Sequence, residues 1–220
     1  MLSREKVLGI APRCKKSALW IKTDARIPQN LRRSAKAAVA FGGPINLWIN
    51  NVGISGWRPL GKIDEKFWNK MVDTNLKSTL FGCQAALPYM QKGGVIINIS
   101  SLAGKRGSAN NSVYCATKFG VNGITQSLAK ELGPRGIRVN AVCPVYLQTP
   151  GLESALREKY SPSNGKAVGN YLKKFATENA ALHRLPEAEE VANLCLFLAS
   201  PAASAITGQC INVDCGVLPQ

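Results

Sequence analysis

The residues of this chain best suited to do chemistry are a tyrosine and a lysine four positions apart, with a serine upstream. On a helix, Tyr114 and Lys118 lie on one face about one turn from each other. A phenol ordinarily titrates near about 10, and an ammonium group beside it favours the phenolate. The spacing therefore predicts a Tyr114 phenol with a pKa lowered by Lys118, and Ser101 can add a hydroxyl to the same centre.

A Tyr-x-x-x-Lys spacing alone is equally typical of a solvated helix face, so the surrounding elements decide between the two interpretations. Apolar runs predict strands at residues 18–21, 45–49, 94–101, 136–143 and 209–213, and helices are predicted at residues 4–15, 29–41, 64–91, 112–132 and 186–199. This alternation predicts an α/β fold, a doubly wound parallel sheet in a single domain. Ser101 then follows a buried strand, where open parallel sheets bind their ligands.

Several segments, in this order, resemble the short-chain dehydrogenase/reductase family. Residues 50–53 (Asn-Asn-Val-Gly) resemble its Asn-Asn-Ala-Gly segment, and Asn75 in Asp-Thr-Asn-Leu falls at its catalytic asparagine. Ser101, Tyr114 and Lys118 complete the family's tetrad. Residues 134–140 and 206–214 also match family segments, so the resemblance covers the chain from about residue 40 onward.

The resemblance implies a Rossmann-like fold and an NAD(P)-dependent oxidoreductase that interconverts a ketone or aldehyde and an alcohol, with tyrosine as general acid/base. It implies NADP as cofactor, with NAD as the alternative, and a small-molecule carbonyl or alcohol substrate. The implied catalytic residues are Asn75, Ser101, Tyr114 and Lys118. The implied cofactor-binding residues are Arg4, Asp24, Asn51, Gly53, Tyr114, Lys118, Pro144, Val145 and Thr149.

The resemblance also implies roles for larger segments. Asn75 would act structurally, by keeping a helix irregularity and a water that connects Lys118 to solvent. Residues 150–185 carry two short predicted helices and would form a lid over the substrate. The helices around residues 67–90 and 113–132 would form the interface of a homodimer or homotetramer, and would expose apolar side chains in an isolated protomer.

The chain departs from the family at its front end. No glycine-rich Thr-Gly-x-x-x-Gly-x-Gly turn, which lets a pyrophosphate approach a helix N-terminus, is found, so residues 1–45 read as an incomplete cofactor half of an N-terminally truncated domain. Loss of the first strand would leave residues 47–49 as an exposed apolar edge. The family's Pro-Gly is also replaced by Pro144-Val145. The alternative function is therefore a non-catalytic truncated member that acts as a binding or oligomer-forming subunit.

Composition narrows the remaining classes of protein. The 220 residues are 45% hydrophobic, enough for one core, and no apolar run is long enough for a membrane span. Seven cysteines without a C-x-x-C pair and a single His183 argue against zinc and favour reduced thiols, as in a cytoplasmic protein or one of the mitochondrial or peroxisomal matrix.

The net charge of +15 has three possible explanations. The first is a solvated basic surface, and the second is attraction of an anionic cofactor, with Arg4 placed at its 2′-phosphate. The third, given the least weight, is either nucleic-acid binding or an organelle-targeting presequence. We expect no nucleic-acid partner.

Overall fold

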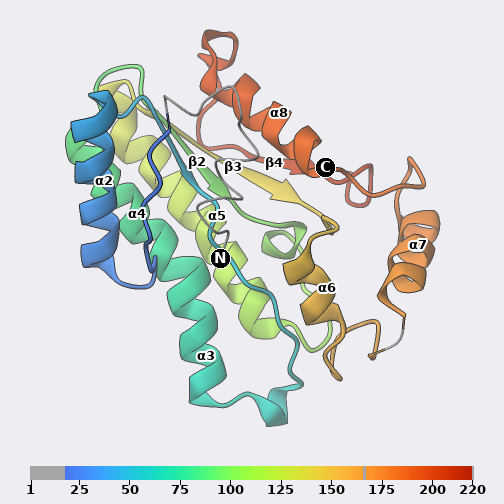
Figure 1. Ribbon diagram of the computed structural model, residues 1–220. Coiled ribbons are helices and arrows are strands. Elements are labelled where there is room, and N and C mark those ends of the chain that lie inside the picture. The colour runs from blue at the N-terminus through green and yellow to red at the C-terminus, as the bar shows by residue number, and fades with distance from the viewer. Residues whose placement is uncertain (1–17, 166, 220) are drawn as a thin grey trace.

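The computed structural model describes residues 18–165 and 167–219, which form a parallel sheet with helices on both faces (Figure 1). The strands are β1 (Leu47–Asn50), β2 (Val95–Ile99), β3 (Arg138–Pro144) and β4 (Cys210–Val213), paired in the order β1-β2-β3-β4. The helices are α2 (Pro28–Gly42), α3 (Glu65–Val72), α4 (Ser78–Ala86), α5 (Ser112–Leu132), α6 (Pro150–Leu156), α7 (Val168–Asn179) and α8 (Ala188–Ala199). The predicted doubly wound sheet is confirmed. None of the helices in these ranges is long and apolar enough to cross a membrane.

Alternate side chains of the central strands bury the two faces of the sheet. Ile96 and its register partner Val139 point to the core formed with α2, α4 and α5. Val95 and Ile97 point to the other face and pack against α8. Because both faces are covered, β2 and β3 are buried along nearly their whole length, as their largely apolar sequences require.

Strand β1 lies at one edge of the described sheet, which confirms the exposed apolar edge expected from the sequence. Leu47 is 37% exposed and Ile49 is 42% exposed. The prediction of a strand at residues 18–21 is wrong, because these residues form no ladder. They run beside β1 across a groove of about 360 Å³ lined by Leu19, Ile21 and Ile49, and a strand without a paired neighbour leaves its backbone hydrogen bonds unmade.

The predicted helix over residues 64–91 is interrupted. Asp64 caps the start of α3 by accepting a hydrogen bond from the Phe67 N–H at 2.7 Å. A π-helical turn, Asp73–Lys77, then joins α3 to α4, and a short 3₁₀ turn, Leu87–Tyr89, ends the run. The local apolar pattern gave no signal for the π turn, and only the family resemblance led us to expect an irregularity at Asn75, whose tertiary contacts are described below.

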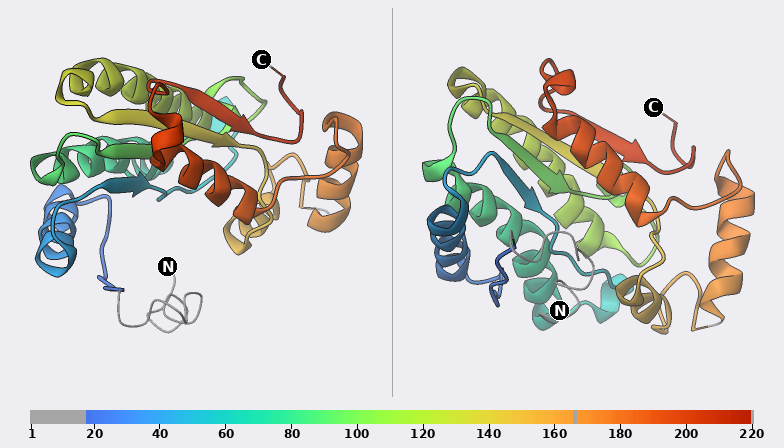
Figure 2. Two further views of the ribbon diagram at one scale, coloured as in Figure 1. Left: turned by 90° about the horizontal axis from the view of Figure 1, so that it is seen from above. Right: turned by 45° about the horizontal axis from the view of Figure 1, so that its top comes forward.

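The other predicted elements are largely confirmed. The helices predicted at residues 29–41, 112–132 and 186–199 correspond to α2, α5 and α8, whereas the one at 4–15 lies outside the described residues. Residues 150–185 form α6 and α7, separated by turns at residues 161–165. Helices α2 and α7 lie at opposite sides of the molecule (Figures 1 and 2).

Candidate active site

The carboxyl ends of the parallel strands open into one large cavity. Asn51 follows β1, Ser101 follows β2 and Val145 follows β3, and all three line a cavity of about 830 Å³. Helix α5 passes beneath this edge and contributes Tyr114 and Lys118 to the same lining. The cavity therefore lies where the polar residues that follow each strand were predicted to meet a ligand.

The three residues singled out by their chemistry are brought together. Ser101 begins a 3₁₀ turn, Leu102–Gly104, and its Oγ accepts a hydrogen bond from the Ala103 N–H at 3.1 Å. The Ser101 hydroxyl is also near enough to the Tyr114 phenol to act on its pKa, which it lowers. Lys118 Nζ lies 5.8 Å from the centre of the Tyr114 ring, so the cation, phenol and hydroxyl share one end of the cavity.

The predicted lowering of the Tyr114 pKa by Lys118 is wrong for this structure. Burial raises the pKa of the phenol above its ordinary value, and the nearby Ser101 hydroxyl only partly opposes this effect. Burial also lowers the pKa of Lys118 to about 8, because the residue is only 5% exposed and the charged ammonium loses its contact with water. Desolvation dominates both shifts, and helical spacing alone carries no information on desolvation.

The Lys118 ammonium is held at the end of β2. Its Nζ donates a hydrogen bond to the Ile99 carbonyl at 2.9 Å. Gly104 allows the close approach of the turn to α5, because a Cβ at this position would lie 2.7 Å from the Lys118 carbonyl oxygen. A Cβ on Gly53 would lie 3.5 Å from Nζ, which sets the loop after β1 beside the same ammonium.

Asn75 lies in the π-helical turn and is fully buried. Its Oδ1 accepts a hydrogen bond from the Ile54 N–H at 2.8 Å, and its Nδ2 donates to the Ile54 carbonyl at 2.9 Å. Nδ2 also lies 3.3 Å from Thr117 Oγ1 on α5. The helix irregularity expected at Asn75 is confirmed, and the side chain ties the loop after β1 to the helix that carries Tyr114 and Lys118.

A second buried polar chain fixes the strand ends that carry the site. Asn50 Nδ2 donates to Asn98 Oδ1 at 2.8 Å, and Asn98 Nδ2 donates to Thr125 Oγ1 at 2.9 Å. Trp48 Nε1 donates to Asn50 Oδ1 at 2.8 Å. These bonds connect β1, β2 and α5, so they hold the loop after β1 in register with the serines after β2.

The predicted cofactor-binding residues divide into two groups. Seven of them line the large cavity: Asn51, Gly53, Tyr114, Lys118, Pro144, Val145 and Thr149. Asp24 does not, because it lies before α2, where its carboxylate forms an ion pair with Arg26 at 2.6 Å. Arg4 lies outside the described residues.

The described residues fit one part of a dinucleotide cofactor and not another. The nicotinamide and ribose end fits the cavity, which offers an ammonium, a phenol and an amide side chain within one lining. Within the described ranges, however, no glycine-rich turn leads from a strand directly into a helix, so these residues show no cradle for a pyrophosphate.

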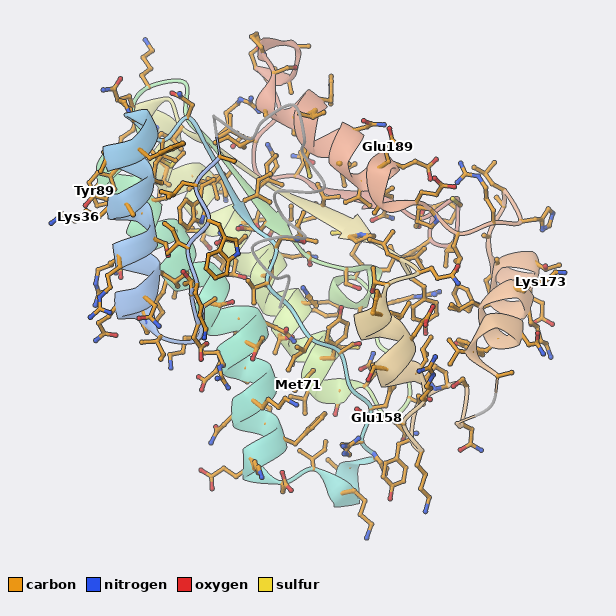
Figure 3. The ribbon with its side chains drawn as sticks, in the orientation of Figure 1. Lys36, Met71, Tyr89, Glu158, Lys173 and Glu189 are labelled. Atoms are coloured by element: carbon orange, nitrogen blue, oxygen red, sulfur yellow. The ribbon has the colours of Figure 1, made fainter. Side chains whose placement is uncertain are left out.

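Several residues of the cavity were missed by the sequence analysis. Trp57, Arg58 and Glu158 lie on loops, and Arg58 Nη1 forms an ion pair with Glu158 Oε2 at 2.5 Å. Figure 3 shows that Met71 comes from α3 and Glu158 from the segment after α6. Tyr146, two positions after Pro144, was within reach of sequence reasoning because it continues the loop that follows β3. The others carry no local spacing signal.

The architecture and the cavity define a Rossmann-like α/β protein, and comparisons with known proteins agree. A family model described as enoyl-(acyl carrier protein) reductase matches residues 2–218. A 3-oxoacyl-acyl-carrier-protein reductase of Thermotoga maritima is 38% identical over 178 residues, which are 80% of this chain and 67% of the relative. A diacetyl reductase, (S)-acetoin forming, of Staphylococcus aureus is 36% identical over 187 residues, which are 84% of this chain and 72% of the relative.

Solved structures give the same result. A short-chain dehydrogenase/reductase of Brucella melitensis, titled glucose/ribitol dehydrogenase, superposes with a TM-score of 0.87 at 28% identity, covering 100% of this chain and 84% of that one. An aldohexose dehydrogenase of Thermoplasma acidophilum has a TM-score of 0.82 at 29% identity, covering 91% and 81%. The chain belongs to the short-chain dehydrogenase/reductase family, whose members are NAD(P)-dependent oxidoreductases.

Proposed function

We propose that this protein interconverts a ketone or aldehyde and the corresponding alcohol, using NADP or NAD, at the cavity at the carboxyl edge of its sheet. The observation that carries the proposal is the meeting of Ser101, Tyr114 and Lys118 at one end of that cavity. The nicotinamide supplies the hydride, so the residues of the chain have to hold the carbonyl and manage one proton.

Tyr114 is the proton donor in this proposal. Since burial raises the pKa of its phenol, the side chain is protonated at neutral pH and is ready to protonate the oxygen of a carbonyl under reduction. The Ser101 hydroxyl donates a hydrogen bond to the same oxygen, where negative charge develops. A charged Lys118 favours the phenolate that remains after the transfer.

Two other predicted roles remain part of the proposal. Asn51, Gly53, Pro144, Val145 and Thr149 would contact the nicotinamide end, and Lys118 would bind the ribose. We infer that residues 150–185 cover the substrate, since Leu152, Tyr171 and Phe175 line the cavity from that segment.

The proposal is tested by measuring oxidation of NADPH and NADH with a panel of ketones and aldehydes. Tyr114→Phe should lower kcat by about 10²- to 10⁴-fold, because a general acid is typically worth that much in rate. Tyr89→Phe is the matched control, since Tyr89 lies outside the cavity, at the end of the run that begins with α3 (Figure 3). A Tyr114→Phe variant with the full wild-type rate would show that the acid has been assigned to the wrong residue.

A second candidate function is a binding or oligomer-forming subunit without catalysis. It is favoured by the described residues, which include neither a pyrophosphate cradle nor a strand on the outer side of β1. Calorimetry with NADP and NAD separates the two candidates. Dissociation constants in the micromolar range favour the enzyme, and the absence of any binding heat at millimolar cofactor favours the subunit.

We also infer a homodimer or homotetramer, as both candidate functions allow. Apolar side chains are exposed along α3, α4 and α5, with Trp68 at 46%, Leu80 at 42% and Phe119 at 48%. Such side chains form interfaces when they are contiguous on a surface. Light scattering coupled to size exclusion should give at least twice the protomer mass of 23.6 kDa.

A further inference from the structure

The cavity that contains Tyr114 and Ser101 also has aromatic side chains in its lining. Trp57, Phe67, Tyr146 and Phe175 are among the residues that line it. The Tyr146 ring packs edge-on against Phe175, with the ring centres 4.9 Å apart. Aromatic walls of this kind accept the hydrocarbon part of a ligand, and a few polar groups then fix its orientation.

The charged groups around this cavity are unequal in number. Among the described residues, four cations line the cavity, namely Arg58, Lys70, Arg106 and Lys118, whereas Glu158 is the sole carboxylate. Glu158 is already paired with Arg58. Within the described part of the chain, neither Lys70 nor Arg106 forms an ion pair. The cavity therefore has an excess of positive charge beside apolar walls, an arrangement that attracts anions.

Apart from Lys118, Arg106 is the cation most closely tied to the reacting end. It follows the turn begun by Ser101, and its backbone N–H donates to the Leu102 carbonyl at 3.1 Å. Its carbonyl accepts a weak hydrogen bond from the Cys115 thiol at 3.8 Å, next to Tyr114 on α5. The backbone of Arg106 is thus fixed to both elements that carry the proposed chemistry.

The charge of Arg106 acts on a residue of the cavity lining, Tyr146. Burial raises the pKa of the Tyr146 phenol, the hydrogen bond with Tyr171 adds to this effect, and the Arg106 guanidinium opposes both. The Tyr114 phenol also raises the pKa of Tyr146. Arg106 itself is exposed and lines the cavity, so its guanidinium remains available to an anionic ligand at this side of the cavity.

The loop that begins at Arg106 offers a second polar group. All residues from Arg106 to Asn111 line the cavity, and Asn111 is only 5% exposed. Its Nδ2 lies 3.3 Å from Ser108 Oγ, whereas its Oδ1 has no hydrogen-bond partner among the described residues. If the amide is turned by half a rotation, the Ser108 hydroxyl donates to Oδ1 and an N–H is left without a partner. In either orientation one buried polar atom of Asn111 needs a partner that a ligand could supply.

From this geometry we propose that the loop of residues 106–111 is an anion subsite, and that the preferred substrate is a carbonyl compound carrying a carboxylate. The carbonyl lies at Tyr114 and Ser101, the hydrocarbon lies against the aromatic walls, and the carboxylate pairs with Arg106. This inference rests on the proposed function for its reaction, but the subsite itself binds anions whether or not hydride transfer occurs.

The test compares ligands that differ only in charge. 4-Acetylbenzoate and 4-acetylbenzamide are stable aromatic ketones of nearly equal shape, and their reduction is followed through NADPH or NADH oxidation. Wild type should favour the carboxylate in kcat/KM, and Arg106→Gln should lose about tenfold on the carboxylate and less than about twofold on the amide, as expected for one charge-assisted hydrogen bond. Arg106→Lys should keep most of the preference. Arg33→Gln, an exposed arginine of α2 away from the cavity, is the matched control and should change neither rate.

A binding measurement without turnover separates this proposal from the proposed function. Calorimetry with 4-isopropylbenzoate and 4-isopropylbenzamide, which have no reducible ketone, should show tighter binding of the carboxylate and loss of that preference in Arg106→Gln. A charge preference without any turnover leaves the subsite standing and refutes the oxidoreductase. Equal kcat/KM for the two ketones in wild type and in Arg106→Gln, or equal affinity for the two isopropyl compounds, overturns the subsite.

Discussion

Replacing Lys118 by methionine removes a buried ammonium whose pKa burial lowers from 10.5 to about 8. Between these values the unfolded chain binds more protons at this position than the folded chain, so stability rises with pH. The charge therefore costs the folded wild type about 3 kcal/mol at neutral pH, and this cost disappears as the pH approaches 10.5. By the same relation, the free energy of unfolding of wild type should rise by about 2 kcal/mol between about pH 7 and about pH 9.5.

Methionine does not titrate, so the difference in the free energy of unfolding between wild type and Lys118→Met reports the titration of Lys118 alone. Urea unfolding followed by tryptophan fluorescence, at about pH 7 and about pH 9.5, gives the free energy of unfolding of each. The loss of the 2.9 Å hydrogen bond to the Ile99 carbonyl affects Lys118→Met at both pH values and cancels in the comparison. Wild type should gain about 2 kcal/mol relative to the variant at the higher pH. Lys66→Met, at an exposed position of α3, should show no such gain. A constant difference between wild type and Lys118→Met at both pH values would refute the desolvation argument.

Two further substitutions test how the site is held. Gly104→Ala places a Cβ 2.7 Å from the Lys118 carbonyl oxygen, so the turn has to move away from α5; we expect a loss of about 1–3 kcal/mol in urea unfolding together with a lower kcat. Asn98→Leu removes the centre of the bonds to Asn50 and Thr125 and leaves buried partners unsatisfied, at a cost of about 1–3 kcal/mol. An unchanged midpoint in either variant would show that the contact concerned does not constrain the strand ends.

The sequence predicted most of the sheet because its strands are buried on both faces. Runs such as Val95–Ile99 and Arg138–Pro144 carry that burial in their composition, and their parallel pairing follows from the helices between them. The strand expected at residues 18–21 failed, since a strand depends on a partner that local composition does not reveal. The irregularity at Asn75 was expected only from the family resemblance, because the π turn at Asp73–Lys77 depends on the bonds of Asn75 to Ile54 in another part of the chain.

The sequence predicted which residues meet at the site, but it did not predict how burial changes their pKa values. Tyr114, Lys118 and Ser101 were found from spacing, since helical geometry and the end of a strand fix their relative positions. The direction of the Tyr114 pKa shift was missed, because it is set by how many side chains close over the phenol. Arg106 was missed for a related reason, as its importance depends on which cations lack an acidic partner after folding.

The four strands of the described part of the chain follow one another in space in the same order as in the sequence. Among these described strands, each one after β1 finds a partner immediately upstream, and none has to be inserted between two strands that are already paired. During synthesis the sheet can grow by one strand at a time from β1 toward β4, with each crossover helix laid down before the next pairing. The cavity would then be completed late, when β3 and the segment after it have emerged, so that the half-made protein has no site to bind a ligand.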